Sequence, residues 1–315
     1  MNGLREALNQ YLGLRRALGF KLLQTGRSLL HFVRFAEQEG ATSITTDLAL
    51  QWAQEDGTAG SVTHSDRLAM VRRFATWRSV EDPQTQIPSE GLLPRRYRRP
   101  APYIYSDEEV RNVVSTAGHL PSKSGLRGLT CSTMFGLLAV TGMRISEAVG
   151  LDRGDVDLRI GVLTIREGKR GKSRVVPIHA TTRDALETYS QKRDALLGTM
   201  RTSAFFVSDR RTRISAFCAG ENFIEVSRKT GLRPPAPDGC RGRGPRLHDF
   251  RHRFAVSTLI RWYQSGADVD REIPKLATYL GHKGANEVYW YLQAVPELLE
   301  LATLRSEEVA SGGAS

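Results

Sequence analysis

The chain has 315 residues, which is too long for one small core and predicts two domains of ordinary size. Lys and Arg outnumber Asp and Glu by 45 to 34, so the formal net charge is +11 and the pI is near 9.9. Such a balance is expected of a protein that binds phosphate groups, although a merely solvated basic surface has the same composition.

The cysteines and the apolar segments argue against secretion and membrane insertion. Cys131, Cys218 and Cys240 lie far apart without a CxxC pair, so neither a disulfide framework nor a zinc site is supported. The first residues lack an apolar signal segment, and the longest apolar run, residues 135–140, is far too short to cross a bilayer. We expect a cytoplasmic, nucleoid-associated protein in a reducing compartment, without membrane contact.

Residues 1–82 are predicted to form a bundle of four short helices. Apolar residues recur there at helical spacing, for example over residues 29–35. The Thr-Asp pair at residues 46–47 is a candidate cap for one helix, and Gly40 and Gly57 are expected helix stops.

Residues 83–104 are predicted to be a linker between two domains. Five prolines and a cluster of arginines occur there, a composition that excludes regular helix and strand. A basic linker in a cationic protein is expected to follow a phosphate backbone, with a simple solubility role as the alternative. The expected DNA contacts are Arg95, Arg96, Arg98 and Arg99.

Residues 105–315 are predicted to form a mainly helical (α+β) domain with a small antiparallel sheet. Ser106 and Glu109 match a capping box that opens its first helix. Two β-rich segments flank a basic turn, and a third candidate strand follows; they are residues 162–166, 173–178 and 204–208. Helical patterns cover residues 181–197, 215–230, 247–263, 271–280 and 286–304.

A loop rich in proline, glycine and arginine, residues 233–246, interrupts these helices. Such a segment is either disordered or becomes ordered on a ligand. This loop and the basic turn supply the remaining expected DNA contacts, which are Lys172, Arg174, Arg241, Arg243 and Arg246.

Two arginines are candidates for binding a phosphate. His248 and Arg251 stand three apart on an expected helix, so both side chains project from one face, although this pair alone is weak evidence. Arg144 follows a glycine turn, with Glu147 one turn further on. That second pair is either a surface ion pair of small effect or an arginine held in place by a carboxylate.

Taken in order, the motifs resemble one family. T-G-x-R-x-S-E, G-K-x-x-K-x-R, H-x-x-R and L-G-H followed by a tyrosine are similar to the tyrosine recombinase (phage integrase) family, over nearly the whole chain. The resemblance implies a C-shaped clamp around DNA, in which residues 1–82 are a core-binding (SAM-like) domain and residues 105–315 the catalytic domain. The catalytic residues that it implies are Arg144, Lys169, His248, Arg251, His282 and Tyr291.

The resemblance also implies a biological setting. It indicates a bacterial mobile-element integrase that acts in integration, excision or transposition, without a metal or cofactor. The implied partners are a double-stranded DNA recombination site and further recombinase subunits, which form a homo- or hetero-tetramer on DNA. A terminal helix that starts at Pro296 is expected either to close the protein's own core or to dock on a neighbouring subunit.

The chemistry of these residue types agrees with that reading. Attack on a phosphodiester spreads negative charge over the phosphate oxygens, where two arginines present paired donors. Forming phenolate from a tyrosine near neutral pH costs about 4 kcal/mol, which cationic arginines and a histidine base reduce. His248 is the suggested base and His282 the phosphate hydrogen-bond donor, roles that are exchangeable.

The general acid and the nucleophile each have rivals in the sequence. Lys169 is the acid that the resemblance implies, and Lys172 competes from the same turn. Tyr291 has the family's spacing for the nucleophile; Tyr289 lies about 200° around the helix from it, and Tyr279 is read as packing.

Two other functions compete with strand exchange. A type IB topoisomerase uses the same chemistry but rejoins the same strand. A catalytically silent accessory subunit would bind DNA through the basic linker and the helical bundle alone.

Overall fold

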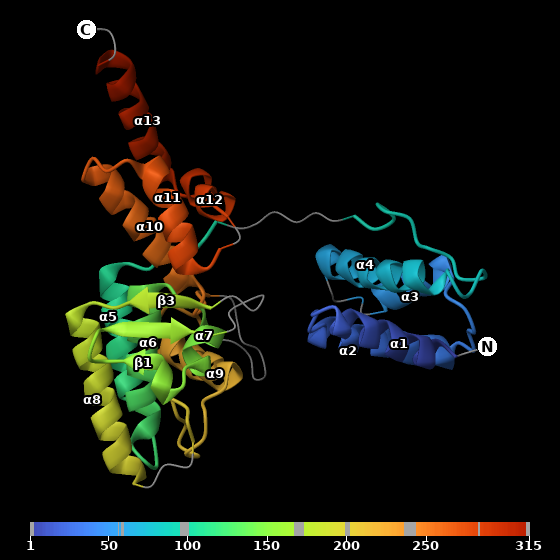
Figure 1. Ribbon diagram of the computed structural model, residues 1–315, viewed down its shortest axis with the longest axis horizontal. Coiled ribbons are helices and arrows are strands. Elements are labelled where there is room, and N and C mark those ends of the chain that lie inside the picture. Colours follow the sequence, from blue (N-terminus) through green and yellow to red (C-terminus); the bar gives the residue numbers. More distant parts are fainter. Residues whose placement is uncertain are drawn as a thin grey trace. The chain divides into compact units, whose positions relative to one another are not determined.

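A computed structural model describes two compact units, Met1–Pro100 and Ala101–Ser315 (Figure 1). The boundary between them lies inside the segment predicted to be a linker, residues 83–104. The described residues are 3–55, 57, 60–94, 101–166, 173–198, 202–235, 244–282 and 284–312.

The first unit contains four helices in its described part: α1 (Leu4–Ala17), α2 (Leu23–Gln38), α3 (Thr46–Gln54) and α4 (Ser61–Arg78). Its core includes the buried rings of Phe32 and Trp52, which meet edge to face with centroids 5.3 Å apart. Gly40, with φ +68°, directly follows Glu39, the C-cap of α2, and ends this helix as predicted. The predicted cap of α3 was wrong by one residue, because the side chain of Thr45 accepts the hydrogen bond from the Leu48 amide.

The second unit is mainly helical around a small antiparallel sheet, as predicted. The sheet order is β1 (Val156–Asp157), β2 (Val162–Ile165) and β3 (Arg174–Pro177). The helices are α5 (Asp107–Gly118), α6 (Leu126–Thr141), α7 (Ile145–Gly150), the 3-10 helix η1 (Arg153–Asp155), α8 (Ala180–Leu197), α9 (Ala216–Lys229), α10 (Asp249–Gln264), α11 (Val269–Leu280), α12 (Asn286–Ala294) and α13 (Pro296–Gly312).

The strand predicted at residues 204–208 was wrong. This apolar segment makes only an isolated bridge at Ala204 and another at Val207, and β1 supplies the third strand instead. Side chains of α8 occupy two of the backbone groups that a strand would pair: Tyr189 accepts from the Val207 amide, and Arg193 donates to the Phe205 carbonyl. Other backbone groups bond singly to loop residues, as the Phe205 amide does to the Leu151 carbonyl at 2.9 Å. A buried apolar run therefore has its polar groups satisfied without a neighbouring strand.

Helix α6 runs through the centre of the second unit and packs against α5, α8, α9 and α10. The predicted capping box at Ser106 and Glu109 opens α5. Helices α10, α11, α12 and α13 gather at one end of this unit around their own apolar cluster (Figure 1). Tyr291 belongs to that cluster, so the packing of these helices fixes the predicted nucleophile. Within the described residues, no helix has both the length and the hydropathy needed to cross a bilayer.

Candidate active site

The turn between α6 and α7 places Arg144. Helix α6 ends at Gly142, whose φ is +60° and where a Cβ atom would lie 2.7 Å from the ring of Phe254. Two residues later, the backbone amide of Arg144 donates to Glu147 Oε2 at 2.9 Å, and its Nη1 donates to Glu147 Oε1 at 2.8 Å. The Glu147 side chain is only 4% exposed, so this is a buried pair that holds the arginine, and the surface ion pair weighed from the sequence is excluded.

A second arginine shares the same carboxylate. Arg174 on β3 donates from Nη1 and Nη2 to the two oxygens of Glu147, at 3.0 and 2.8 Å, and from Nε to the Tyr279 carbonyl at 2.7 Å. Burial alone would raise the pKa of Glu147, but the hydrogen bonds from Arg174 and Arg144 outweigh it and lower that pKa to about 2. Arg174 was predicted to contact DNA, yet all three guanidinium nitrogens are engaged within the domain and its side chain is 12% exposed.

Arg251 meets Arg144 at the end of α11. Arg251 is 2% exposed and donates to the Gly142 carbonyl at 2.9 Å and to the Leu280 carbonyl at 2.7 Å. Arg144 donates to the same Leu280 carbonyl at 3.5 Å and to the Gly281 carbonyl at 3.0 Å. Burial, with the nearby positive charge of Arg144, lowers the pKa of Arg251 to about 10, so the guanidinium remains charged at neutral pH. The structure therefore brings the two predicted arginines together.

Gly281 and His282 directly follow Leu280, whose carbonyl accepts from both arginines. Gly281 has φ +68°, and a Cβ atom there would lie 2.9 Å from Nη1 of Arg174. This glycine thus permits the close approach between the end of α11 and the arginines. The side chain of His282 is 6% exposed, and its Nε2 lies 3.8 Å from a carboxylate oxygen of Glu287.

Tyr291 lies against α10 and is 1% exposed. Its hydroxyl oxygen is 2.7 Å from Nδ1 of His252, a residue to which the sequence analysis gave no role. The phenol is also close enough to Arg251 for a phenolate to raise the pKa of that arginine. His248 is exposed at the N-cap of α10, and its ring centroid lies 4.9 Å from that of His252. A sequence signal for His252 existed, since it directly follows Arg251 and lies one turn after His248.

The other two candidate tyrosines lie in different surroundings. Tyr289 is 37% exposed, and its hydroxyl donates to Asp270 on α11 at 3.1 Å. Tyr279 stacks on Phe254 with centroids 5.5 Å apart, and burial raises its pKa to about 12. Among these three tyrosines, it is Tyr291 whose hydroxyl contacts a histidine.

Comparison with known proteins shows the family of this chain. Residues 108–297, more than half of the chain, match the model of the phage integrase family. The chain belongs to the phage integrase family. It is 43% identical over 311 residues to y4rB of Sinorhizobium fredii, a protein named as an integrase/recombinase, and the match covers 98% of both chains.

Solved structures share the fold of this integrase-family chain. The Tn1549 transposon integrase in complex with transposon right-end DNA matches with a TM-score of 0.65 and 16% identity, over 96% of this chain and 99% of that one. A lambda integrase tetramer bound to a Holliday junction matches with a TM-score of 0.61 and 18% identity, over 91% and 79%.

Several predicted residues of this family member cannot be placed, because they lie outside the described residues: Lys169, Lys172, Arg95, Arg96, Arg98, Arg99, Arg241 and Arg243. Arg246 is exposed; its amide donates to Asp249 at 2.7 Å and its carbonyl accepts from the Tyr105 hydroxyl at 3.2 Å. Within the described part of the chain, no group of three or more His, Cys, Asp or Glu side chains is arranged to hold a metal ion.

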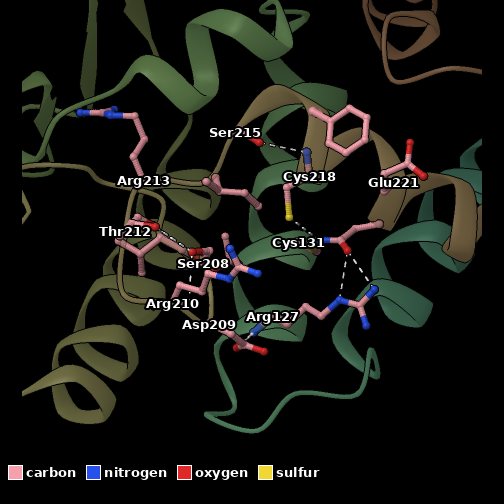
Figure 2. Close-up of a pocket in the computed structure, with 15 residues that line it drawn as sticks. Arg127, Cys131, Ser208, Asp209, Arg210, Thr212, Arg213, Ser215, Cys218 and Glu221 are labelled. Atoms are coloured by element: carbon pink, nitrogen blue, oxygen red, sulfur yellow. Dashed lines mark hydrogen bonds between the residues drawn. The ribbon is translucent and has the colours of Figure 1, made fainter.

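The second unit of this integrase-family protein also has a cavity of about 630 Å³ between α6, α9 and the segment before α9 (Figure 2). Arg127 donates to the side-chain oxygen of Asn222 at 2.9 and 3.0 Å, and the amide nitrogen of Asn222 lies 3.1 Å from Sγ of Cys131 and 3.9 Å from Sγ of Cys218. The residues that line the cavity do not include any of the six predicted catalytic residues.

Proposed function

We propose that this protein is a site-specific DNA recombinase that cuts and rejoins strands through a 3′-phosphotyrosyl link to Tyr291. The observation that carries the proposal is the convergence of Arg144 and Arg251 on the Leu280 carbonyl, with the Tyr291 hydroxyl beside the second arginine. Membership of the phage integrase family supports the same reaction.

The arginines bind and polarise the scissile phosphate. Both guanidinium groups are charged donors whose positions are set by backbone carbonyls, so they need little rearrangement as negative charge develops on the phosphate oxygens. His282, next to the carbonyls that hold them, adds a hydrogen bond to phosphate. This role of His282 follows from the sequence prediction, in which His248 is the base and the two histidine roles are exchangeable.

Strand cleavage and rejoining are the same step in opposite directions. The Tyr291 hydroxyl gives its proton to the histidine base and its oxygen bonds to phosphorus. The bond from phosphorus to the 5′ oxygen breaks, and that oxygen takes a proton from Lys169, with Lys172 as the alternative acid. A 5′ hydroxyl from a partner strand then attacks the phosphotyrosine. Since the energy of the broken bond is kept in the phosphotyrosine, the cycle needs no ATP.

The partners are a double-stranded recombination site and further recombinase subunits. One tyrosine per subunit cuts one strand, so the exchange of two duplexes needs four subunits, and α13 is the element proposed to contact a neighbour. Residues 1–82 serve as a DNA-binding domain. The name of y4rB and the transposon integrase fold favour integration, excision or transposition of a mobile element, carried out in the cytoplasm at the nucleoid.

Covalent trapping tests the proposal. Duplexes are prepared from the DNA that flanks the gene, and one strand carries a nick. The short fragment with the released 5′ hydroxyl then dissociates at the nick, which prevents rejoining. The wild-type protein is expected to form a covalent protein–DNA adduct, and Tyr291→Phe to form none, a loss of at least about 10⁴-fold. Tyr289→Phe is the matched control and should retain adduct formation, because its hydroxyl contacts Asp270.

Two outcomes would contradict the proposal. Adduct formation by Tyr291→Phe would exclude this tyrosine as the nucleophile, and DNA binding without any adduct in the wild type would indicate a silent accessory subunit. Formation of Holliday junctions from two duplexes separates strand exchange from the relaxation of a single duplex by a topoisomerase.

A further inference from the structure

The contact between Tyr291 and His252 is a buried polar contact with a short distance. The two atoms are 2.7 Å apart, the tyrosine is 1% exposed and the histidine 7% exposed. The centroids of the two rings are 5.5 Å apart, and the interplanar angle is 63°. A hydroxyl at this distance from a ring nitrogen is within the reach required for direct proton transfer.

Asp249 lies on the other side of the same imidazole. Its Oδ1 is 3.9 Å from Nε2 of His252, and its Oδ2 accepts a hydrogen bond from the Arg246 amide at 2.7 Å. A carboxylate beside Nε2 favours the tautomer that carries its proton there, which leaves Nδ1 with a lone pair toward Tyr291. Carboxylate, imidazole and hydroxyl lie in the order found in enzymes that activate a nucleophile, with 3.9 Å between Asp249 and His252, a distance at which the carboxylate acts on the imidazole through its charge.

Side chains of α10 and of α12 face His252. Asp249 lies on α10 and His248 at its N-cap, with the His248 ring 4.9 Å away, while Trp290 and Tyr291 face it from α12. Arg251 acts on the phenol through its charge. The Tyr291 hydroxyl thus lies beside a proton acceptor and close to one of the two cations proposed to bind the phosphate.

We propose that His252 is the general base of the cleavage step; this inference rests on the proposed function. As Tyr291 Oη bonds to phosphorus, its proton passes to Nδ1 of His252, and the 5′ oxygen leaves with a proton from the general acid. In rejoining, the phenolate departs and takes the proton back from Nδ1. The sequence suggested His248 as the base, with its role exchangeable with that of His282, whereas in the structure His252 lies against the nucleophile.

The test measures the rate of adduct formation against pH in a single turnover, with the full chain and a nicked duplex on which the wild type forms an adduct. His252→Asn keeps a polar group near the position of Nδ1 but removes its basicity. We expect a loss of about 10²–10⁴-fold and disappearance of the acidic limb of the pH profile. The exposed His119, at the C-cap of α5, provides the matched control, and His119→Asn should leave both rate and profile unchanged.

A chemical rescue separates proton transfer from a structural role. In His252→Ala, added imidazoles should restore the rate, and the restored rate should depend on the pKa of the imidazole, which packing alone would not produce. A duplex with sulfur in place of the scissile 5′ oxygen has a leaving group that needs no proton. The His252→Asn defect should persist with this duplex, because the base acts on the nucleophile.

The outcomes distinguish this inference from the proposed function. If His252→Asn has the rate and profile of the wild type, or if the sulfur duplex restores it, or if imidazoles fail to rescue His252→Ala, His252 is not the base. Loss of the acidic limb in His248→Asn but not in His252→Asn also overturns the assignment. If the wild type forms no adduct with any duplex, or Tyr291→Phe forms one, the proposed function fails and this inference fails with it.

Discussion

The two halves of the candidate active site are built differently. Arg144 and Arg251 are held by charged hydrogen bonds to Glu147 and to backbone carbonyls at the ends of α6 and α11. Tyr291 lies instead in an apolar cluster of side chains from α10 to α13, with its hydroxyl against His252. Bonds to the backbone fix the arginines in advance of binding, whereas side-chain packing positions the nucleophile. Substitutions in the two halves should therefore impair the protein in different ways.

The largest effect in the arginine half is expected from Arg251→Lys. A lysine keeps the charge but cannot donate to both the Gly142 and Leu280 carbonyls while it also faces a phosphate. We expect the rate of adduct formation to fall by about 10²–10³-fold. Single-turnover rates at saturating protein measure this. Arg253→Lys, on the same helix but paired with the exposed Asp107, is the control, and an equal loss there would contradict the assigned role.

Glu147→Gln tests whether the buried carboxylate holds the arginines. The folded pKa of Glu147 is about 2, below its usual 4.5, so the charged form should contribute about 3 kcal/mol of stability at neutral pH. A lowered pKa means that this contribution is complete above about pH 5 and disappears as the pH falls to about 2. Denaturant unfolding of both proteins across this range measures the difference.

A matched carboxylate controls for a general effect of charge. Glu90 belongs to the other unit, has a side chain that is 91% exposed, and lies 3.9 Å from Arg72. Glu90→Gln should leave stability unchanged across the same pH range. If Glu147→Gln also left stability unchanged, the arginine half would not depend on its carboxylate, and the proposed difference between the two halves would be wrong.

Val288→Ala tests the tyrosine half. Val288 is fully buried in the cluster that contains Tyr291, one turn before it on α12. The cavity left by the substitution should cost about 1–2 kcal/mol of stability. It should also slow adduct formation without weakening the binding of uncleaved DNA, since the arginines are unchanged. Parallel measurement of DNA affinity and adduct rate decides this, and an equal loss of both would show that the halves are coupled.

Gly281→Ala is expected to have the smallest effect. A non-glycine residue at φ +68° costs about 1 kcal/mol, and the added Cβ atom would also lie 2.9 Å from Arg174. Gly266 has φ +71° with no heavy atom within 4 Å of such a Cβ, so Gly266→Ala measures the backbone cost alone. The stability difference between the two variants, from denaturant unfolding, gives the cost of crowding the arginines. No difference would mean that Arg174 moves away freely.

Local patterns in the sequence were sufficient for much of this molecule. Helical periodicity predicted the four helices of the first unit, and the capping pattern at Ser106 predicted the start of α5. These features depend on residues within one or two turns of each other, so the sequence carries their cause directly. The order of the catalytic motifs likewise indicated the family, because residue types and spacing are properties of the chain itself.

Other features depend on contacts that spacing does not reveal. Arg174 bonds to Glu147 across 27 residues, and His252 meets Tyr291 across 39. Residues 204–208 have the composition of a strand, but side chains of α8 bond to two of their backbone groups. The sequence by itself determined which side chains are available for phosphate chemistry. Only the tertiary structure decided which carboxylate holds the arginines and which histidine touches the nucleophile, because packing brings distant segments together.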